Sequence, residues 1–241
     1  MKKFTVLSQL AGLVLAAYSL QCSGLAFTNK TDFLTALPGT SGVLNFDGLS
    51  AGTDLSGVTL TVSGGPNTSI LFPSTVNDGQ GTNLSLMIAA DNLTSSSPNS
   101  LGVNDSGNYN AISGGTNIDL GMTNLVNAFG LSFITPDDMV DGDIKLVIGN
   151  QTASLLTNDR TLVGNVSGDN YYAYFLGIIA DSGFNSARIR YGTGADGAFL
   201  YNADDLTVAV ATTKLPEPPT VLLMLGGALV ASLIQRKRRD P

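Results

Sequence analysis

The sequence predicts an all-β domain, an antiparallel and jelly-roll-like β-sandwich, for residues 27–214. Apolar residues alternate with polar ones in many short runs, such as 58–62 and 187–191, and this period of two directs every second side chain to a core. Clusters of Gly, Asn, Asp and Ser separate the runs, and no long amphipathic helical pattern occurs. Short strands joined by turns favour a sandwich over an α/β fold.

The elements are expected in the following order along the chain. One short helix is predicted over 28–37, with Thr28 or Thr31 as its N-cap. Residues 91–115 are rich in polar residues and predict a loop. Gly149-Asn150 predicts a tight hairpin turn, and the run 171–180, apolar on both faces, predicts a central strand. Strands are expected at 58–62, 129–133, 144–148, 152–156, 171–180, 187–191 and 206–210.

The charge of this body is strongly negative. Between residues 27 and 214 there are 6 Lys/Arg and 17 Asp, so the formal charge is 6 − 17 = −11. Such a balance argues against nucleic-acid binding, which depends on neutralising phosphates. The chain has no histidine, and its one cysteine, Cys22, precedes the body, so triads that contain histidine and cysteine-based metal sites are excluded from it.

Residues 1–26 have the organisation of a secretory signal peptide. Lys2 and Lys3 supply the charged start, residues 6–20 are mostly apolar, and Gly24-Leu25-Ala26 supplies small residues at the two required positions. Cleavage is therefore expected between Ala26 and Phe27. A lipid anchor on Cys22 is disfavoured because no leucine stands three residues before it and Gln21 directly precedes it.

The last 27 residues have three parts in a fixed order. Pro216-Glu217-Pro218 follows the body, residues 220–234 carry no charge, and a basic cluster closes the run with Arg236, Lys237, Arg238 and Arg239. Fifteen helical residues span about 23 Å, which snorkelling and bilayer thinning can extend to a membrane span. The cations should stay cytoplasmic. A plain tail anchor and a buried core helix are the alternatives to a processed sorting signal.

In order and spacing, these three parts resemble the PEP-CTERM sorting signal of Gram-negative bacteria. The resemblance implies recognition by an exosortase and export to the cell surface or to an extracellular, biofilm-forming polysaccharide matrix. It also implies that residues 220–234 anchor the protein in the membrane, either transiently or stably. The motif differs from the sortase signal of Gram-positive bacteria, because Pro218-Pro219 stands where Thr-Gly is needed.

Two groups of aspartates could hold a structural Ca²⁺, which prefers oxygen ligands. Asp137, Asp138, Asp141 and Asp143 fall within seven residues between two predicted strands; a solvated acidic turn is the alternative. The second candidate pairs Asp47, which ends an early predicted strand, with Asp205, which precedes the last one. No other cofactor is expected.

The body resembles the generic jelly-roll domains that often precede this signal, in Asn45-Phe46-Asp47-Gly48-Leu49 and Asp204-Asp205-Leu206 among other short stretches. The leading interpretation is a non-enzymatic exported protein, with no catalytic residues assigned. A carbohydrate-binding module that uses Tyr171, Tyr172, Tyr174 and Phe175 or the acidic loop is the first alternative. An aspartate-dependent glycoside hydrolase is the second.

Overall fold

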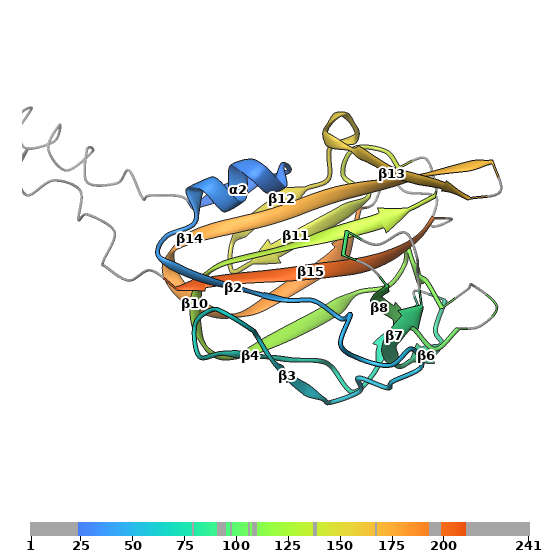
Figure 1. The fold of residues 1–241 in the computed structure, drawn as a ribbon, viewed down its shortest axis with the longest axis horizontal. Coiled ribbons are helices and arrows are strands. Elements are labelled where there is room, and N and C mark those ends of the chain that lie inside the picture. Colours follow the sequence, from blue (N-terminus) through green and yellow to red (C-terminus); the bar gives the residue numbers. More distant parts are fainter. Residues whose placement is uncertain are drawn as a thin grey trace, which may run out of the picture.

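The chain folds as a mostly antiparallel β-structure, so the predicted all-β class is confirmed. The computed structural model describes residues 24–210, apart from 79, 91–94, 97, 106, 108–109, 137–138, 167 and 193–198. Figure 1 shows long strands stacked across the molecule, with one short helix, α2, above them. No helix among the described residues is long and apolar enough to cross a membrane, and the predicted segment 220–234 lies outside them.

Two sheets and two short helical elements make up the described structure. The strands are β1 (Leu25–Phe27), β2 (Thr40–Leu44), β3 (Thr59–Thr61), β4 (Ser69–Leu71), β5 (Val76–Asn77), β6 (Asn83–Leu84), β7 (Leu86–Ala90), β8 (Asn99–Val103), β9 (Ile112–Ser113), β10 (Ile118–Thr135), β11 (Ile144–Ile148), β12 (Gln151–Ser154), β13 (Thr161–Val166), β14 (Asp169–Tyr191) and β15 (Leu200–Val210). The helices are α2 (Lys30–Ala36) and the single 3₁₀ turn η2 (Thr157–Asp159). The main sheet follows the order β12-β11-β14-β10-β15-β8-β7, and β5-β6 form a separate pair.

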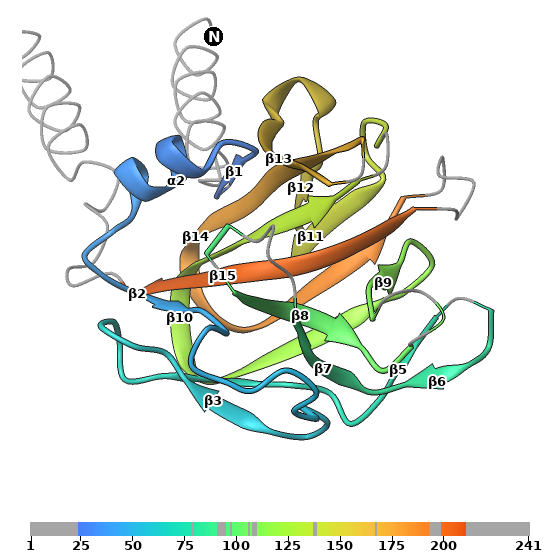
Figure 2. The same cartoon turned by 45° about the vertical axis from the view of Figure 1, so that its right-hand side comes forward.

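The antiparallel pair β10–β14 is the spine of the main sheet. Its register runs from Ile118↔Ile189 to Thr135↔Tyr172, with register shifts between Gly121 and Ala128. Such bulges bend a strand pair, and residues 181–183 of β14 are exposed there. Figure 2 shows both strands curving at this point, so that each contributes to both halves of a sandwich-like fold.

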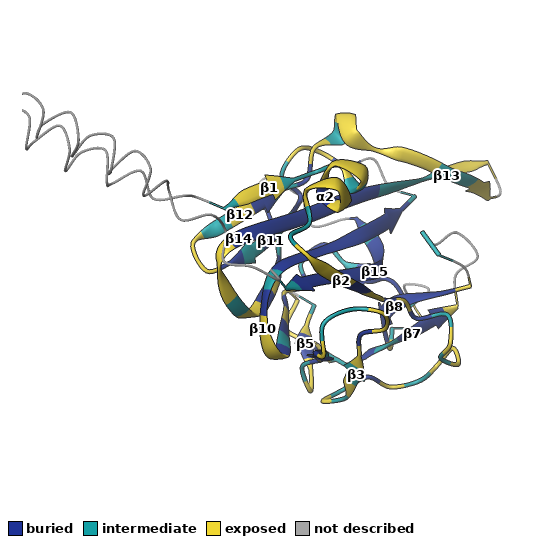
Figure 3. Cartoon of the chain, turned by 60° about the vertical axis from the view of Figure 1, so that its left-hand side comes forward, coloured by how far each residue is buried: buried dark blue, intermediate teal, exposed yellow. Residues whose placement is uncertain are grey.

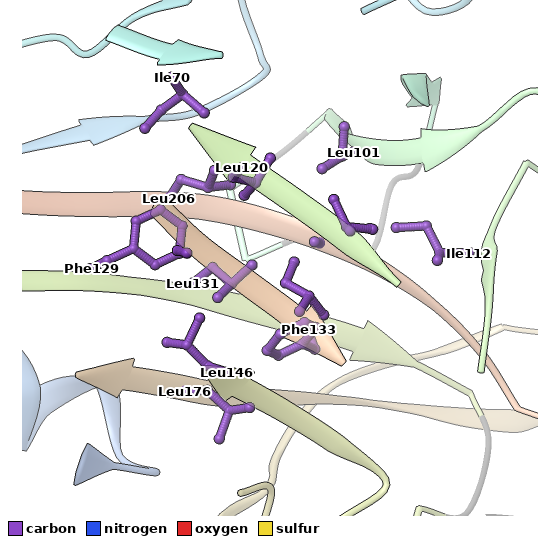
Figure 4. Packing of buried hydrophobic residues seen from close by; sticks show 14 of the residues in the cluster. Ile70, Leu101, Ile112, Leu120, Phe129, Leu131, Phe133, Leu146, Leu176 and Leu206 are labelled. Carbon is purple, nitrogen blue, oxygen red and sulfur yellow. The ribbon is translucent and has the colours of Figure 1, made fainter. Parts of the chain in front are cut away.

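The hydrophobic core lies inside this bend. Leu120 comes from the first half of β10 and Phe129, Leu131 and Phe133 from the second, yet all four are buried in one cluster. Figure 4 shows them among residues from the neighbouring strands, including Leu146, Leu176 and Leu206. Alternating apolar residues on both halves of the bent pair therefore fill a single interior.

Helix α2 covers the outer face of the middle of β14. Asn29 caps it by accepting hydrogen bonds at Oδ1 from the N–H groups of Thr31 (2.9 Å) and Asp32 (3.2 Å), so the predicted caps Thr28 and Thr31 were wrong. A free amide oxygen at this position satisfies two N–H groups that the helix leaves unpaired. Figure 3 shows the exposed outer side of α2 above the buried middle of β14.

Phe33 of α2 rests on a floor made by two glycines. Gly130 and Gly177 are cross-strand partners, and a Cβ added to either one would lie within 3.0 Å of the ring of Phe33. The ring also packs against Phe175 at 5.1 Å and Phe27 at 5.6 Å between centroids. The run 171–180 is apolar on both faces because one face meets the core and the other meets this aromatic cluster.

The strands also bear on the predicted Gly149-Asn150 turn and on the loop predicted over 91–115. The hairpin turn at Gly149-Asn150 is confirmed, since Ile148 pairs with Gln151 and Gly149 has a φ of +58°. The loop expected over 91–115 was wrong in part, because β8 lies within it and all five of its residues are buried. Its Asn, Ser and Gly residues gave no alternating pattern, so burial between β7 and β15 was not visible in the sequence.

Replacing Phe33 by alanine should remove the anchor of α2. The expected loss of unfolding free energy is about 3–5 kcal/mol, because a fully buried ring leaves a cavity over Gly130 and Gly177. Urea unfolding measures this loss. Leu34→Ala, on the neighbouring residue that is 44% exposed, is the control and should cost far less. Equal losses for the two variants would contradict this packing.

Candidate functional site

The most densely connected polar cluster lies where β15 bulges away from β10. Ser132 pairs with Asp204 and Gly130 with Thr207, so Asp205 and Leu206 together oppose a single residue of β10. Asp205 has a φ of +50°, a conformation that aspartate tolerates better than most residues. Asp204 and Asp205 were expected to precede the last strand, but they lie inside it because β15 already begins at Leu200.

The bulge brings the two carboxylates to one hydroxyl group. Ser95 Oγ lies 3.0 Å from Asp204 Oδ2 and 2.7 Å from Asp205 Oδ2. Successive residues of a regular strand point to opposite faces, so this shared contact depends on the break in alternation. Lys30 Nζ donates to Asp205 Oδ2 at 2.8 Å, and the backbone N–H of Ser96 donates to Asp204 Oδ2 at 2.8 Å.

The two acids differ in their proton affinity. Burial raises the pKa of Asp204 to about 6, with a further contribution from the neighbouring charge of Asp205, while the Ser96 N–H opposes the rise. Burial alone would also raise the pKa of Asp205. The hydrogen bonds and charge of Lys30, with the hydroxyl of Ser95, outweigh that effect, so its pKa lies below the ordinary value.

This difference gives the cluster a defined hydrogen-bond direction. A serine hydroxyl has one hydrogen and can donate to only one of the two carboxylates. When Asp204 is protonated it donates to Ser95, and Ser95 donates to the ionised Asp205 that Lys30 also binds. Asp204 is fully buried and Asp205 is 7% exposed, so the arrangement suits a structural role better than hydrolysis of a polysaccharide. We call this group of five residues, Lys30, Ser95, Ser96, Asp204 and Asp205, the latch.

Asp47, the other residue of the predicted pair, makes no hydrogen bond to Asp205 in the described structure. Its Oδ1 accepts a weak hydrogen bond from the N–H of Asn99 at 3.4 Å, and Asn99 Nδ2 donates to Leu49 O at 2.8 Å. Among the described residues, no group of three acidic, histidine or cysteine residues is placed to hold a metal. A cation at Asp205 would have to displace the ammonium group of Lys30, so this site fits Ca²⁺ poorly.

The acidic loop before β11 is the second candidate. Asp137 and Asp138 lie outside the described residues. Asp141 Oδ1 accepts from the N–H (2.7 Å) and hydroxyl (2.9 Å) of Thr157, and these bonds lower its pKa. Asp143 is 4% exposed, and its Oδ2 accepts from the Val140 N–H at 2.7 Å. Its other oxygen, Oδ1, is buried with no hydrogen-bond partner in the part of the chain that the structure describes.

The aromatic residues of the predicted sugar-stacking surface are mostly inside the protein. Tyr174 and Phe175 are 3% and 5% exposed and contribute to the core clusters. The guanidinium of Arg160 covers the ring of Tyr172 at 4.2 Å. The stretch 171–175 therefore does not present an open aromatic platform.

The processing signals lie at or beyond the ends of the described structure. Ala26 and Phe27, on either side of the expected cleavage site, pair with Ile178 and Gly177 inside β1. Cleavage there requires an extended, unpaired chain and would remove Leu25 and Ala26, so only Phe27 of β1 would remain in the mature body. Pro216-Glu217-Pro218 and the basic cluster Arg236, Lys237, Arg238 and Arg239 fall outside the described residues.

Sequence reasoning missed most of the latch. Lys30 is 175 residues away from Asp205, and Ser95 is 110 residues away, so no local spacing connects them. The adjacent Asp204-Asp205 was the one visible signal. In comparisons with protein-family models, curated proteins and solved structures, no match to this chain was found.

The latch should make stability depend on pH. Because the pKa of Asp204 is higher in the folded protein, the native state binds more protons than the unfolded chain between about pH 4 and 6. The free energy of unfolding should therefore fall as pH rises through this window, by on the order of 2 kcal/mol. The lowered pKa of Asp205 makes the free energy of unfolding rise with pH, but it does so below the ordinary pKa of aspartate and therefore outside this window.

Asp204→Asn removes the titrating group, so its unfolding free energy should lack this fall when measured at pH 4, 5, 6 and 7. Asp32→Asn, on exposed α2, is the control and should keep the fall. A fall that persists unchanged in Asp204→Asn would contradict the assignment to Asp204.

A Ca²⁺ site remains a prediction, and the structure favours Asp143 as its ligand, since Asp143 has a buried acceptor without a partner. With free Ca²⁺ at ten times its Kd, binding should add about 1.4 kcal/mol and raise Tm by about 3–6 °C. Asp143→Asn should lose the shift, and Asp205→Asn should keep it. Differential scanning fluorimetry with and without chelator measures both. An unchanged wild-type Tm would count against both sites, and loss only in Asp205→Asn would favour the Asp47–Asp205 site.

Proposed function

We propose that this protein is a non-enzymatic, exported protein of the cell surface or extracellular matrix, sorted through its PEP-CTERM tail by an exosortase. The tail carries the proposal, because its motif, apolar segment and basic cluster occur together at the required spacing. In this proposal the jelly-roll-like body has a structural role: it folds and remains stable outside the membrane. The absence of histidine from the sequence agrees with a non-enzymatic role.

One property of the fold supports the expected topology. Leu25 pairs with Ile179, Ile179 with Ala128, and Ala128 with Ala209. The first residue of β1 and the end of β15 therefore lie in one row across the sheet, three strand spacings or roughly 14 Å apart. The start of the body and the segment that follows β15 therefore lie at the same end of the sheet, which is the end nearest the membrane while the proposed tail is inserted.

The latch supports the same role. α2 and the segment that contains Ser95 and Ser96 are both tied to β15 by partly buried, charge-assisted hydrogen bonds. A latch of this kind stabilises a body without exposing reactive groups. Among the described residues, the buried acids Asp143, Asp204 and Asp205 each accept at least one hydrogen bond from the protein.

The proposal is tested by expressing the full chain in a bacterium that has an exosortase and in its exosortase deletion strain. In the first strain the body should lose its tail, as measured by mass spectrometry, and leave the inner membrane. In the second it should stay full-length and membrane-bound. Glu217→Ala should behave like the deletion strain because it breaks the Pro-Glu-Pro motif.

Pro219→Ala, just outside the motif, is the matched control and should be processed normally. Replacing Arg236, Lys237, Arg238 and Arg239 by serine should impair insertion, because the positive-inside signal is lost. Identical processing in both strains would reduce the tail to an ordinary anchor and overturn the proposal.

A further inference from the structure

The basic residues of the body are not evenly distributed. Only six occur between residues 27 and 214, and three of them lie together on β11 and β14: Lys145, Arg188 and Arg190. Lys145 is the cross-strand partner of Arg190, and Val147 is that of Arg188. Figure 1 shows β11 lying alongside β14 in the main sheet.

Strand alternation places all three cations on the outer face. Leu146 and Ile189 are fully buried and form the inner face of these strands. Lys145 is next to Leu146 on β11, and Arg188 and Arg190 are on either side of Ile189 on β14. Their side chains must therefore point outward, and that of Arg188 is 58% exposed. We call this surface, defined by Lys145, Arg188 and Arg190, the basic face.

One acid, Asp119, lies among the cross-strand partners of the residues that form the basic face. Asp119 is the cross-strand partner of Arg188, and its Oδ1 accepts a hydrogen bond from Arg190 Nη2. Arg188 Nε lies farther away, at 3.8 Å from the same oxygen. The four groups carry a formal charge of 3 − 1 = +2, whereas the body as a whole carries −11. The basic face is therefore opposite in sign to the rest of the protein.

The basic face still has donors to offer. Lys145 makes no ion pair within the described ranges. Arg190 is partly engaged, because its Nη1 donates to Ile118 O and Ile189 O and its Nη2 donates to Asp119. Arg188 is more exposed and approaches Asp119 only through Nε, so most of its five N–H groups can meet a ligand. Arg188 and Arg190 are two residues apart along one strand, about 6.8 Å, and Lys145 is about 5 Å across from Arg190. Thr152 and Ser154 of β12 continue the two rows with hydroxyl groups.

We propose that the basic face binds an acidic, carboxylate-bearing polysaccharide. Paired arginines match carboxylates, and neighbouring hydroxyl groups match sugar hydroxyls. A densely charged polyphosphate such as DNA, or an anionic bilayer, would be repelled by the −11 body beyond this small face. A polymer with at most one carboxylate per sugar has a lower charge density than DNA, so it meets the three cations with less repulsion from the body. This inference deepens the proposed matrix role, on which it rests for the presence of the polymer.

Binding of the detergent-solubilised full chain to polygalacturonate, measured by biolayer interferometry at low salt, tests the proposal. Wild type should bind, and binding should weaken as salt rises because the contacts are electrostatic. Lys145→Gln/Arg188→Gln/Arg190→Gln should weaken binding at least tenfold. Asp119→Asn should strengthen it several-fold by removing the negative charge that lies beside the two arginines.

Two variants supply matched controls. Arg160→Gln removes a cation elsewhere, and Asp181→Asn removes an acid on the exposed bend of β14, so each repeats a charge change off the basic face. Both should bind like wild type. Equal binding by the triple variant, equal binding to neutral dextran, or tighter binding to DNA would each overturn the proposal. The purified chain needs no exosortase, so failure here is distinguishable from failure of tail processing.

Discussion

The hydrogen-bonded ladder between β10 and β14 is the constraint on which the rest of the structure depends. β1, β11 and β13 pair with β14, whereas β4 and β15 pair with β10, so every other part of the main sheet is attached through these two strands. The bend in the middle of the ladder turns one sheet into two facing halves. Without the register shifts near Gly121 and Ala128, the same apolar residues would line a flat sheet with no interior.

A second irregularity, the bulge at Asp205, has a different consequence. Two like charges placed side by side in a buried region are costly unless one is neutralised and the other is paired. Below about pH 6, protonation of Asp204 meets the first condition, and the ammonium group of Lys30 meets the second. The same bonds join α2 and the Ser95 segment to β15, so three parts of the chain that are distant in sequence depend on one another.

The sequence predicted what repeats locally and missed what depends on distant contacts. The all-β class, the Gly149-Asn150 turn and the two-faced burial of 171–180 all follow from residue alternation and turn chemistry. β8 was missed because Asn99 and Ser100 are buried by neighbours rather than by their own hydrophobicity. In the same way, adjacent aspartates suggested a site near Asp205, but Lys30 as its cation could be found only from the fold.

The position of β15 determines how the body would respond to tension. If the proposed tail anchors the protein, a load from that anchor would enter the body at Val210 and act along the axis of β15. This strand is hydrogen-bonded to β10 along one edge and to β2, over Thr40–Leu44, along the other. Pulling along the strand shears both ladders at once instead of opening them one bond at a time. The end of β15 is therefore well placed to bear mechanical force.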